Sequence, residues 1–209
     1  GIADDDTVES SNLPRQILHT PENIDEPKVD SARKRIRELN PDVTVNAYRQ
    51  HIKAENIMGI IRNYDIIIDG SDNFATKFLL NDACVLGKIP LVHAGVLRYN
   101  GQVMTIIPKD KTACYRCLFR EPPPPGTVPT CSEAGILNTV AGIIGLVQAT
   151  EAIKYITGLE QLLTNRLFIF DALTMACRTI AIRPDRDCPV CGQTPVIKTP
   201  RDLQTNECR

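Results

Sequence analysis

The stretch that decides the fold is Asp65-Ile66-Ile67-Ile68-Asp69-Gly70-Ser71-Asp72-Asn73, an apolar β-branched run that ends abruptly in carboxylates and small residues. A central parallel strand that delivers a site at its carboxyl end has this form. Residues 74–87 follow with apolar side chains at helical spacing, and residues 89–95 form a second buried run. This order predicts a βαβ unit.

The same alternation extends to both sides of the unit. Before it, the pattern predicts a strand ending near Ala3, an amphipathic helix between Pro27 and Asn40, a strand over residues 43–48 and a crossover helix over residues 54–63. After it, we expect an antiparallel strand over 102–108 entered through a turn at Asn100-Gly101, a long helix over 136–157 ended by Gly158, and a hairpin of strands over 167–171 and 177–182. These elements predict an α/β fold with a Rossmann-like open sheet, parallel in its first half and mixed or antiparallel in its second.

Composition sets the outer limits. The 209 residues are 43% hydrophobic and 23% charged, which is the balance of a globular protein with one sizeable core, so we expect a single domain over residues 1–209. A net charge of -1 gives no electrostatic reason to expect nucleic acid or a membrane surface as a partner. Since no apolar run approaches about 20 residues and no signal peptide is visible, a cytoplasmic location is expected.

Four of the eight cysteines form two Cys-x-x-Cys pairs, Cys114 with Cys117 and Cys188 with Cys191. Each pair can place two thiolates on one ion, and two pairs complete a closed tetrahedral shell of the kind that holds structural zinc. The alternative is a redox dithiol, but that motif is expected once, near a helix start, and not as a matched pair. The pattern therefore predicts a zinc site that ties the tail back to the body of the protein.

Polar residues at strand ends predict a second site. Asp4, Asp72 and Asn73 are expected along one carboxyl edge of the sheet, with Arg15 and Lys28 on loops that reach the same crevice. A carboxylate beside two cations suits a magnesium nucleotide. The alternative is that the aspartates only cap turns and that Arg15 is a solvated surface residue.

Cys131 is a third candidate, because it lies in a loop just before a predicted helix, where the pKa of a thiol tends to fall. That position suits a nucleophile. The alternative is an incidental loop thiol.

Several separated motifs, in order along nearly the whole chain, resemble the ThiF/MoeB/HesA family, the prokaryotic relatives of ubiquitin-activating enzymes. The matching stretches are residues 4–16 (DDDTVESSNLPRQ), 27–29 (PKV), 69–74 (DGSDNF), 114–117 (CYRC), 130–135 (TCSEAG), 151–154 (EAIK) and 188–192 (CPVCG). The resemblance implies an adenylation domain with a crossover loop over about residues 118–135 and a zinc-bound tail over about residues 184–209.

The resemblance also implies an activity. It is that of an adenylyltransferase, a nucleotidyltransferase that uses MgATP to activate the C-terminal glycine of a ubiquitin-like sulfur carrier with a Gly-Gly tail, of MoaD or ThiS type. Carried over by position, Asp4 would hold the ribose, Ser11, Asn12, Arg15 and Lys28 the phosphates, and Asp72 the magnesium, with Asn73 beside it. Cys131 matches a loop cysteine that accepts the activated carrier in some members and is dispensable in others. A homodimer and a sulfur donor such as a cysteine desulfurase are implied partners. The pathway stays open between molybdopterin, thiamin, tRNA thiolation and cysteine synthesis.

Two departures from the family pattern matter. The family's first strand, its glycine-rich nucleotide loop and an arginine supplied across the dimer interface would precede Gly1, so we expect an N-terminally incomplete chain that binds ATP poorly. Pro14 replaces a polar residue of the Asn-Leu-x-Arg motif. The tail after Cys191 shows no rhodanese-like domain, which argues against the longer eukaryotic forms.

Two rival functions remain. One is a zinc-stabilised module that binds a carrier protein without catalysis. The other is a dinucleotide-dependent oxidoreductase, because an early strand followed by aspartate also suits ribose binding. The oxidoreductase has no use for Arg15 together with Lys28, so the adenylyltransferase is preferred.

Overall fold

The computed structural model describes residues 1–124, 127 and 134–203, which divide into two compact units, Gly1–Ile52 and Lys53–Arg209. In the first unit, β1 (Ile2–Ala3) pairs in parallel with β2 (Ala47–Tyr48). Between them along the chain lie two short 3-10 turns, η1 (Ser10–Asn12) and η2 (Pro21–Asn23), and the helix α1 (Lys28–Leu39). The helix begins directly after Pro27 and ends at Asn40, as predicted. The strand predicted over residues 43–48 is limited to its last two residues.

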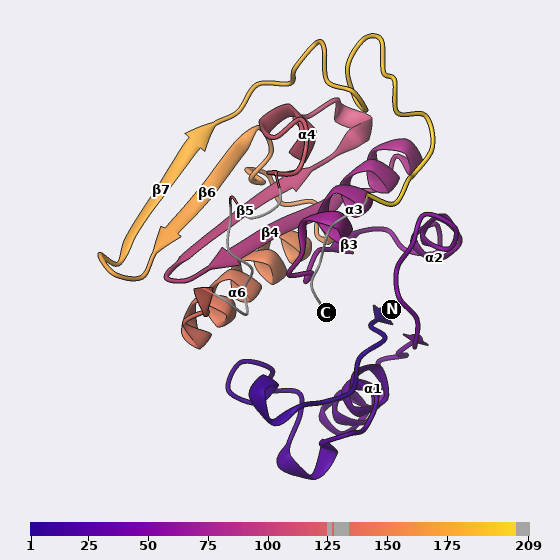
Figure 1. Ribbon diagram of the computed structural model, residues 1–209, viewed down its shortest axis with the longest axis vertical. Coiled ribbons are helices and arrows are strands. Elements are labelled where there is room, and N and C mark those ends of the chain that lie inside the picture. Colours follow the sequence, from indigo (N-terminus) through magenta and orange to yellow (C-terminus); the bar gives the residue numbers. More distant parts are fainter. Residues whose placement is uncertain (125–126, 128–133, 204–209) are drawn as a thin grey trace. The chain divides into compact units, whose positions relative to one another are not determined.

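The second unit is built on a five-stranded sheet in the order β3-β4-β5-β6-β7 (Figure 1). Its strands are β3 (Ile67–Ile68), β4 (Leu91–Leu97), β5 (Asn100–Ile106), β6 (Arg166–Asp171) and β7 (Ala176–Ala181). Its helical segments are α2 (Ile57–Ile61), α3 (Phe74–Gly87), η3 (Pro108–Asp110), α4 (Tyr115–Leu118) and α6 (Asn138–Ile156). β3 and β4 are parallel and the later pairs are antiparallel, so the predicted change from parallel to antiparallel pairing is confirmed.

The core of this unit follows from the alternation of side chains along β4. Val92 and Ala94 pack with Val103, Phe170 and the α6 residues Val140 and Ile144 in one cluster. His93, which lies between Val92 and Ala94 in the sequence, points to the other face and contacts the Tyr115 ring at 4.1 Å between ring centroids, and Tyr115 contacts Phe78 of α3. β4 is therefore covered by α6 on one face and by α3 and α4 on the other.

The turn between β4 and β5 corrects one prediction. Asn100-Gly101 was expected to form the turn, but Leu97 pairs with Asn100, so the turn residues are Arg98 and Tyr99, and Arg98 takes the positive φ of 53°. Gly101 lies inside β5 for a different reason. A Cβ at this position would lie 2.2 Å from Cγ1 of Ile144, so the glycine lets α6 approach the strand closely. By contrast, Gly158 ends α6 with a φ of 69°, as predicted.

Among the described residues, no helix has the length and apolar character needed to cross a bilayer.

A buried ionisable cluster lies at the end of β3. The Asp69 side chain is fully buried, with Nζ of Lys77 at 3.3 Å and Nδ1 of His93 at 2.8 Å from its Oδ2. Burial would raise the pKa of Asp69, but the Lys77 ammonium, His93 and Ser71 outweigh burial and hold it below its usual value. For His93, burial lowers the pKa more than Asp69 raises it, so the imidazole is neutral at pH 7.

The close approach of α6 to β5 gives a stability prediction. Gly101→Ala should lower the free energy of unfolding by about 1–3 kcal/mol, because the new methyl group overlaps the buried Ile144 side chain. Gly59→Ala is the matched control: a Cβ there meets nothing within 4 Å, and alanine favours α2 by about 0.5–1 kcal/mol. Denaturant unfolding of both variants measures the difference. Equal stability of the two would contradict the close-packing explanation.

The neutral state of His93 gives a pH prediction. The folded-state pKa is lowered while the unfolded chain titrates near its ordinary value, so the unfolded state binds the extra proton and stability falls as the pH drops below about 6.5. The loss should reach at most about 1.4 kcal/mol per pH unit, and His93→Gln should flatten the curve between about pH 6.5 and 5. Asp69 also loses its stabilising contribution in acid, but only below about pH 4. His51→Gln, at an exposed position of the first unit, is the control; a His93→Gln curve as steep as that of the parent would refute the assignment.

Candidate functional site

The first unit gathers three of the predicted nucleotide-binding residues around one hollow of about 290 Å³. Asp4, Arg15 and Lys28 line it, together with Gln16, and the other lining residues are Ile2, Ile17, Leu18, His19 and Ala32. Asp4 comes directly after β1, and Lys28 is the first residue of α1, so a strand end and a helix start place the two side chains together. The structure therefore brings Asp4, Arg15 and Lys28 together around one hollow within this unit.

Lys28 lies close to two carboxylates. Nζ of Lys28 lies 2.7 Å from Oδ2 of Asp6 and 3.9 Å from Oδ1 of Asp4. Partial burial raises the pKa of Asp4, and this shift is opposed by the Asp6 N–H, which donates to its Oδ1 over 2.9 Å, and by Lys28. Two cations beside a carboxylate can bind phosphate oxygens and a ribose hydroxyl respectively.

Ser11 and Asn12 shape the loop that carries Arg15. The side chain of Asn12 is buried, and its Oδ1 accepts the Glu9 N–H at 3.2 Å across η1. The backbone oxygen of Ser11 accepts a hydrogen bond of 2.9 Å from the Arg15 guanidinium. Asn12 therefore stabilises the conformation of the loop, and the Ser11 carbonyl holds the Arg15 guanidinium in place.

Gln16 also lines the hollow, although it was not among the residues predicted for the site. Its Oε1 atom is buried without a hydrogen-bond partner among the described residues, although the residue lines the hollow. A buried acceptor of this kind is available to a donor on a ligand. The residue lies next to the Asn-Leu-x-Arg motif, so only that proximity could have indicated it.

In the second unit, Asp72 and Asn73 occupy the turn between β3 and α3. Asn73 is the N-cap of α3, and its Oδ1 accepts the Thr76 N–H at 2.8 Å. Asp72 is exposed just before a helix start. The start of a helix favours anions, and the adjacent carboxylate suits a cation that accompanies one. Asp4 and Asp72 belong to different units, so their expected placement along one edge stays a prediction.

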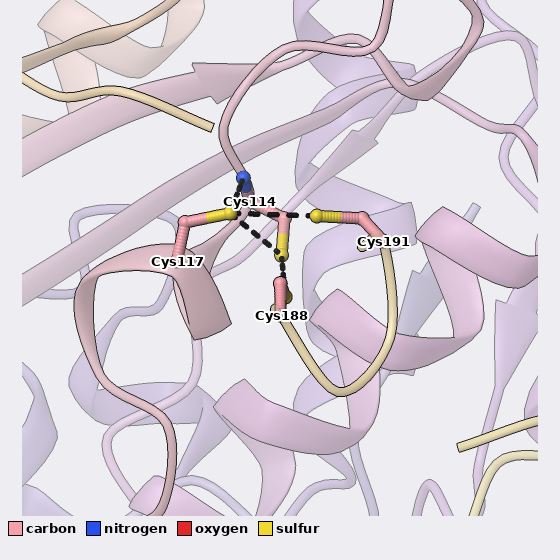
Figure 2. A group of neighbouring side chains, drawn as sticks. All are labelled: Cys114, Cys117, Cys188 and Cys191. Carbon is pink, nitrogen blue, oxygen red and sulfur yellow. Dashed lines mark hydrogen bonds between the residues drawn. The ribbon is translucent and has the colours of Figure 1, made fainter. Parts of the chain in front are cut away.

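The two cysteine pairs meet in space, as predicted (Figure 2). The four Sγ atoms lie within 4.8 Å of one another, and Sγ of Cys114 is 3.6 Å from Cys188 while Sγ of Cys117 is 3.4 Å from Cys191. A tetrahedral ion with metal–sulfur bonds of about 2.3 Å separates its ligands by roughly 3.8 Å. The four thiols therefore have the spacing needed to hold one metal ion.

Buried contacts fix both cysteine loops. Between the first two cysteines, Arg116 forms a bidentate pair with Asp82 of α3, with nitrogen–oxygen distances of 2.7 and 2.8 Å. After the last cysteine, Gly192 approaches the backbone so closely that a Cβ would lie 2.6 Å from the carbonyl oxygens of Arg186 and Cys188. Only glycine fits this return of the chain without a shift of the loop. Cys131, the predicted nucleophile, lies outside the described residues.

Comparison with known proteins gives the family. The ThiF family matches residues 1–190. The SAMP-activating enzyme E1 of Haloferax volcanii is 43% identical over 92% of this chain and 70% of its own length. The sulfur carrier protein adenylyltransferase of Thermus thermophilus is 42% identical over 97% of this chain and 75% of its own length.

A solved structure shows the same fold. The crystal structure of E. coli MccB superposes with a TM-score of 0.80 over 99% of this chain and 60% of that one, at 19% identity. That likeness concerns the architecture, whereas the two sequence relatives and the family match cover most of the chain. The chain belongs to the ThiF family.

Proposed function

We propose that this protein is an ATP-dependent adenylyltransferase that activates the C-terminal glycine of a ubiquitin-like sulfur carrier. The observation that carries the proposal is the hollow that Arg15, Lys28 and Asp4 line together, in a chain of the ThiF family. The two relatives described above are named as an activating enzyme and as a sulfur carrier adenylyltransferase. No observation on this chain favours the non-catalytic module or the oxidoreductase.

The adenylation reaction requires that the negative charge of the ATP phosphates is neutralised and that the two reactants are positioned. The carrier carboxylate is already a nucleophile, so its oxygen attacks the α-phosphorus of ATP and pyrophosphate leaves without a general base. In this proposal Arg15 and Lys28 neutralise phosphate oxygens, Asp4 binds the ribose, and Asp72 beside Asn73 holds magnesium. Ser11 and Asn12 shape the phosphate-binding loop. Cys131 remains the predicted acceptor of the activated carrier.

The partners and setting follow from this function. A carrier with a flexible Gly-Gly tail is the protein substrate, and a sulfur donor such as a cysteine desulfurase would act on the activated carrier. We further propose a homodimer and a single adenylation domain over residues 1–209. Reduced cysteines that bind metal suit the cytoplasm.

The cysteine cluster fits zinc better than other metals, because four thiolates in a tetrahedral arrangement are its usual structural ligands. When bound, zinc would supply a structural cross-link and no catalytic position, since Cys114, Cys117, Cys188 and Cys191 fill its coordination shell. The ion would fasten the C-terminal segment to α4, the short helix that carries Cys117.

Lys28 gives the test of the activity. Lys28→Met should lower the rate of ATP–pyrophosphate exchange in the presence of a Gly-Gly-ended carrier by about 100- to 1,000-fold, because a cation at the phosphates is lost. Lys34→Met, the same substitution at an exposed position of α1, is the control and should leave exchange unchanged. The assay uses the 209-residue chain and a form that includes any residues encoded upstream of Gly1. Carrier binding without exchange in both forms would favour the non-catalytic module instead.

Metal content gives a second, independent test. Elemental analysis should find zinc bound to the cluster, and Cys191→Ser should lose it and lower the Tm, because a structural zinc contributes about 10 kcal/mol or more of binding free energy. Cys177→Ser, at an exposed position of β7, should keep both the metal and the Tm of the parent. Full zinc content in Cys191→Ser would show that the cluster is not the metal site.

A further inference from the structure

Lys77 is a buried cation that the nucleotide chemistry does not use. It lies in the first half of α3, and its side chain is 9% exposed. Its Nζ donates to the backbone oxygens of Ser71 and Ala94, each at 2.6 Å, and lies 3.3 Å from Oδ2 of Asp69. Three acceptors match the three donors of an ammonium group.

The acceptors of Lys77 come from two places that meet at the end of the sheet. Asp69 and Ser71 belong to the turn after β3, and Ala94 belongs to β4. The turn is also held from within, because Oδ1 of Asp69 accepts both the N–H of Ser71, at 2.9 Å, and its hydroxyl, at 2.5 Å. From α6, Gln148 donates to the backbone oxygen of Asp69 at 2.9 Å. The start of the turn therefore has a fixed position relative to the sheet.

Asp72 lies between two points that α3 fixes. On one side, the carbonyl of Ser71 is bound by the Lys77 ammonium. On the other, Asn73 caps the helix through the Thr76 N–H, and its carbonyl oxygen accepts the Lys77 N–H at 3.2 Å. The Asp72 backbone is thus held by one turn of helix, while its side chain is exposed.

We propose that Lys77 is a positioning residue that sets the place of the Asp72 carboxylate in the adenylation reaction. This inference rests on the proposed function, in which Asp72 holds the magnesium of ATP. Lys77 itself touches neither ATP nor the carrier. Its effect passes through Ser71 to the next residue of the turn.

A purely structural role is the competing explanation. A buried ammonium group has a large desolvation cost, and an apolar side chain of similar volume often packs as well without that cost. The structural role predicts lower stability and unaltered kinetics, whereas positioning predicts a loss of rate in a folded enzyme. A displacement of a reacting group by about 1 Å can cost on the order of 100-fold in rate.

The experiment measures ATP–pyrophosphate exchange for the protein carrying Lys77→Met, both as the 209-residue chain and in a form that includes any residues encoded upstream of Gly1. We expect kcat to fall by about 10- to 100-fold, with the KM for the carrier changed by less than about twofold, because only the magnesium ligand is displaced. Thr105→Val is the matched control. It removes a buried 2.6 Å hydrogen bond to Glu151 in the same unit, so it should lower the Tm and leave kcat unchanged.

A double substitution separates the two roles. If Lys77 acts through Asp72, adding Lys77→Met to Asp72→Asn should lower kcat by less than about twofold beyond Asp72→Asn alone. Independent contributions would instead multiply, and that result would overturn the proposal. Should Lys77→Met not fold, Lys77→Gln decides: its side chain keeps a polar donor but is uncharged and one bond shorter, so the bond to the Ser71 carbonyl is weakened and kcat should fall several-fold; an unchanged kcat would overturn the proposal as well.

The outcomes also separate this inference from the proposed function. Absence of exchange in the unsubstituted protein would refute the adenylyltransferase, and the role of Lys77 with it. Normal exchange in the unsubstituted protein, with the same kcat in folded Lys77→Met, would refute the role of Lys77 alone.

Discussion

The second unit depends on the compensation of one buried charge, the Asp69 carboxylate. Removing an ionised carboxylate from water costs several kcal/mol unless close partners replace the lost hydration. Here the partners are Lys77 from α3, His93 from β4 and Ser71 from the turn itself. Because each comes from a different segment, the charge is compensated only when β3, β4 and α3 are assembled together. Its burial thus links the local turn to the tertiary fold.

Helix α3 connects the predicted nucleotide turn to the cysteine cluster. Asn73 caps its start and Lys77 lies in its first turn, and its second half carries Asn81 and Asp82, which are about 10–12 Å from the start at 1.5 Å per residue. Asp82 binds the Arg116 guanidinium, and Oδ1 of Asn81 accepts the N–H of Tyr115 at 2.8 Å. Both partners lie between Cys114 and Cys117, so the first metal-binding loop is built directly on this helix. A bound metal would therefore stabilise the element that shapes the turn, without contact with the reacting groups.

The parts of the site that depend on local patterns could be predicted from the sequence. The cysteine pairs and the bounds of α1 each follow from spacing or from one residue's chemistry. Lys77 and His93 could not be predicted, because a polar residue inside an apolar helix or strand has no periodic pattern of its own, and its partners come from elsewhere in the chain. Gly101 was misread for a related reason: the Asn-Gly pair favours a turn locally, but the contact with Ile144 requires the glycine inside the strand. Non-local packing decided each of these positions.

The two carboxylates of the turn have opposite environments, and this contrast supports different roles for them. Asp69 is fully buried, and an ammonium group, a hydroxyl, a backbone N–H and an imidazole already surround its oxygens, so it has no capacity left for a ligand. Asp72, three residues later, is exposed beside a helix start, where a hydrated cation and its phosphate can approach. The buried Asp69 carboxylate fixes the backbone of the turn, and that backbone sets the position of the exposed Asp72 carboxylate. A reaction that needs no general base depends mainly on the placement of its charged groups. Asp69 and Lys77 therefore contribute to function through geometry and not through proton transfer.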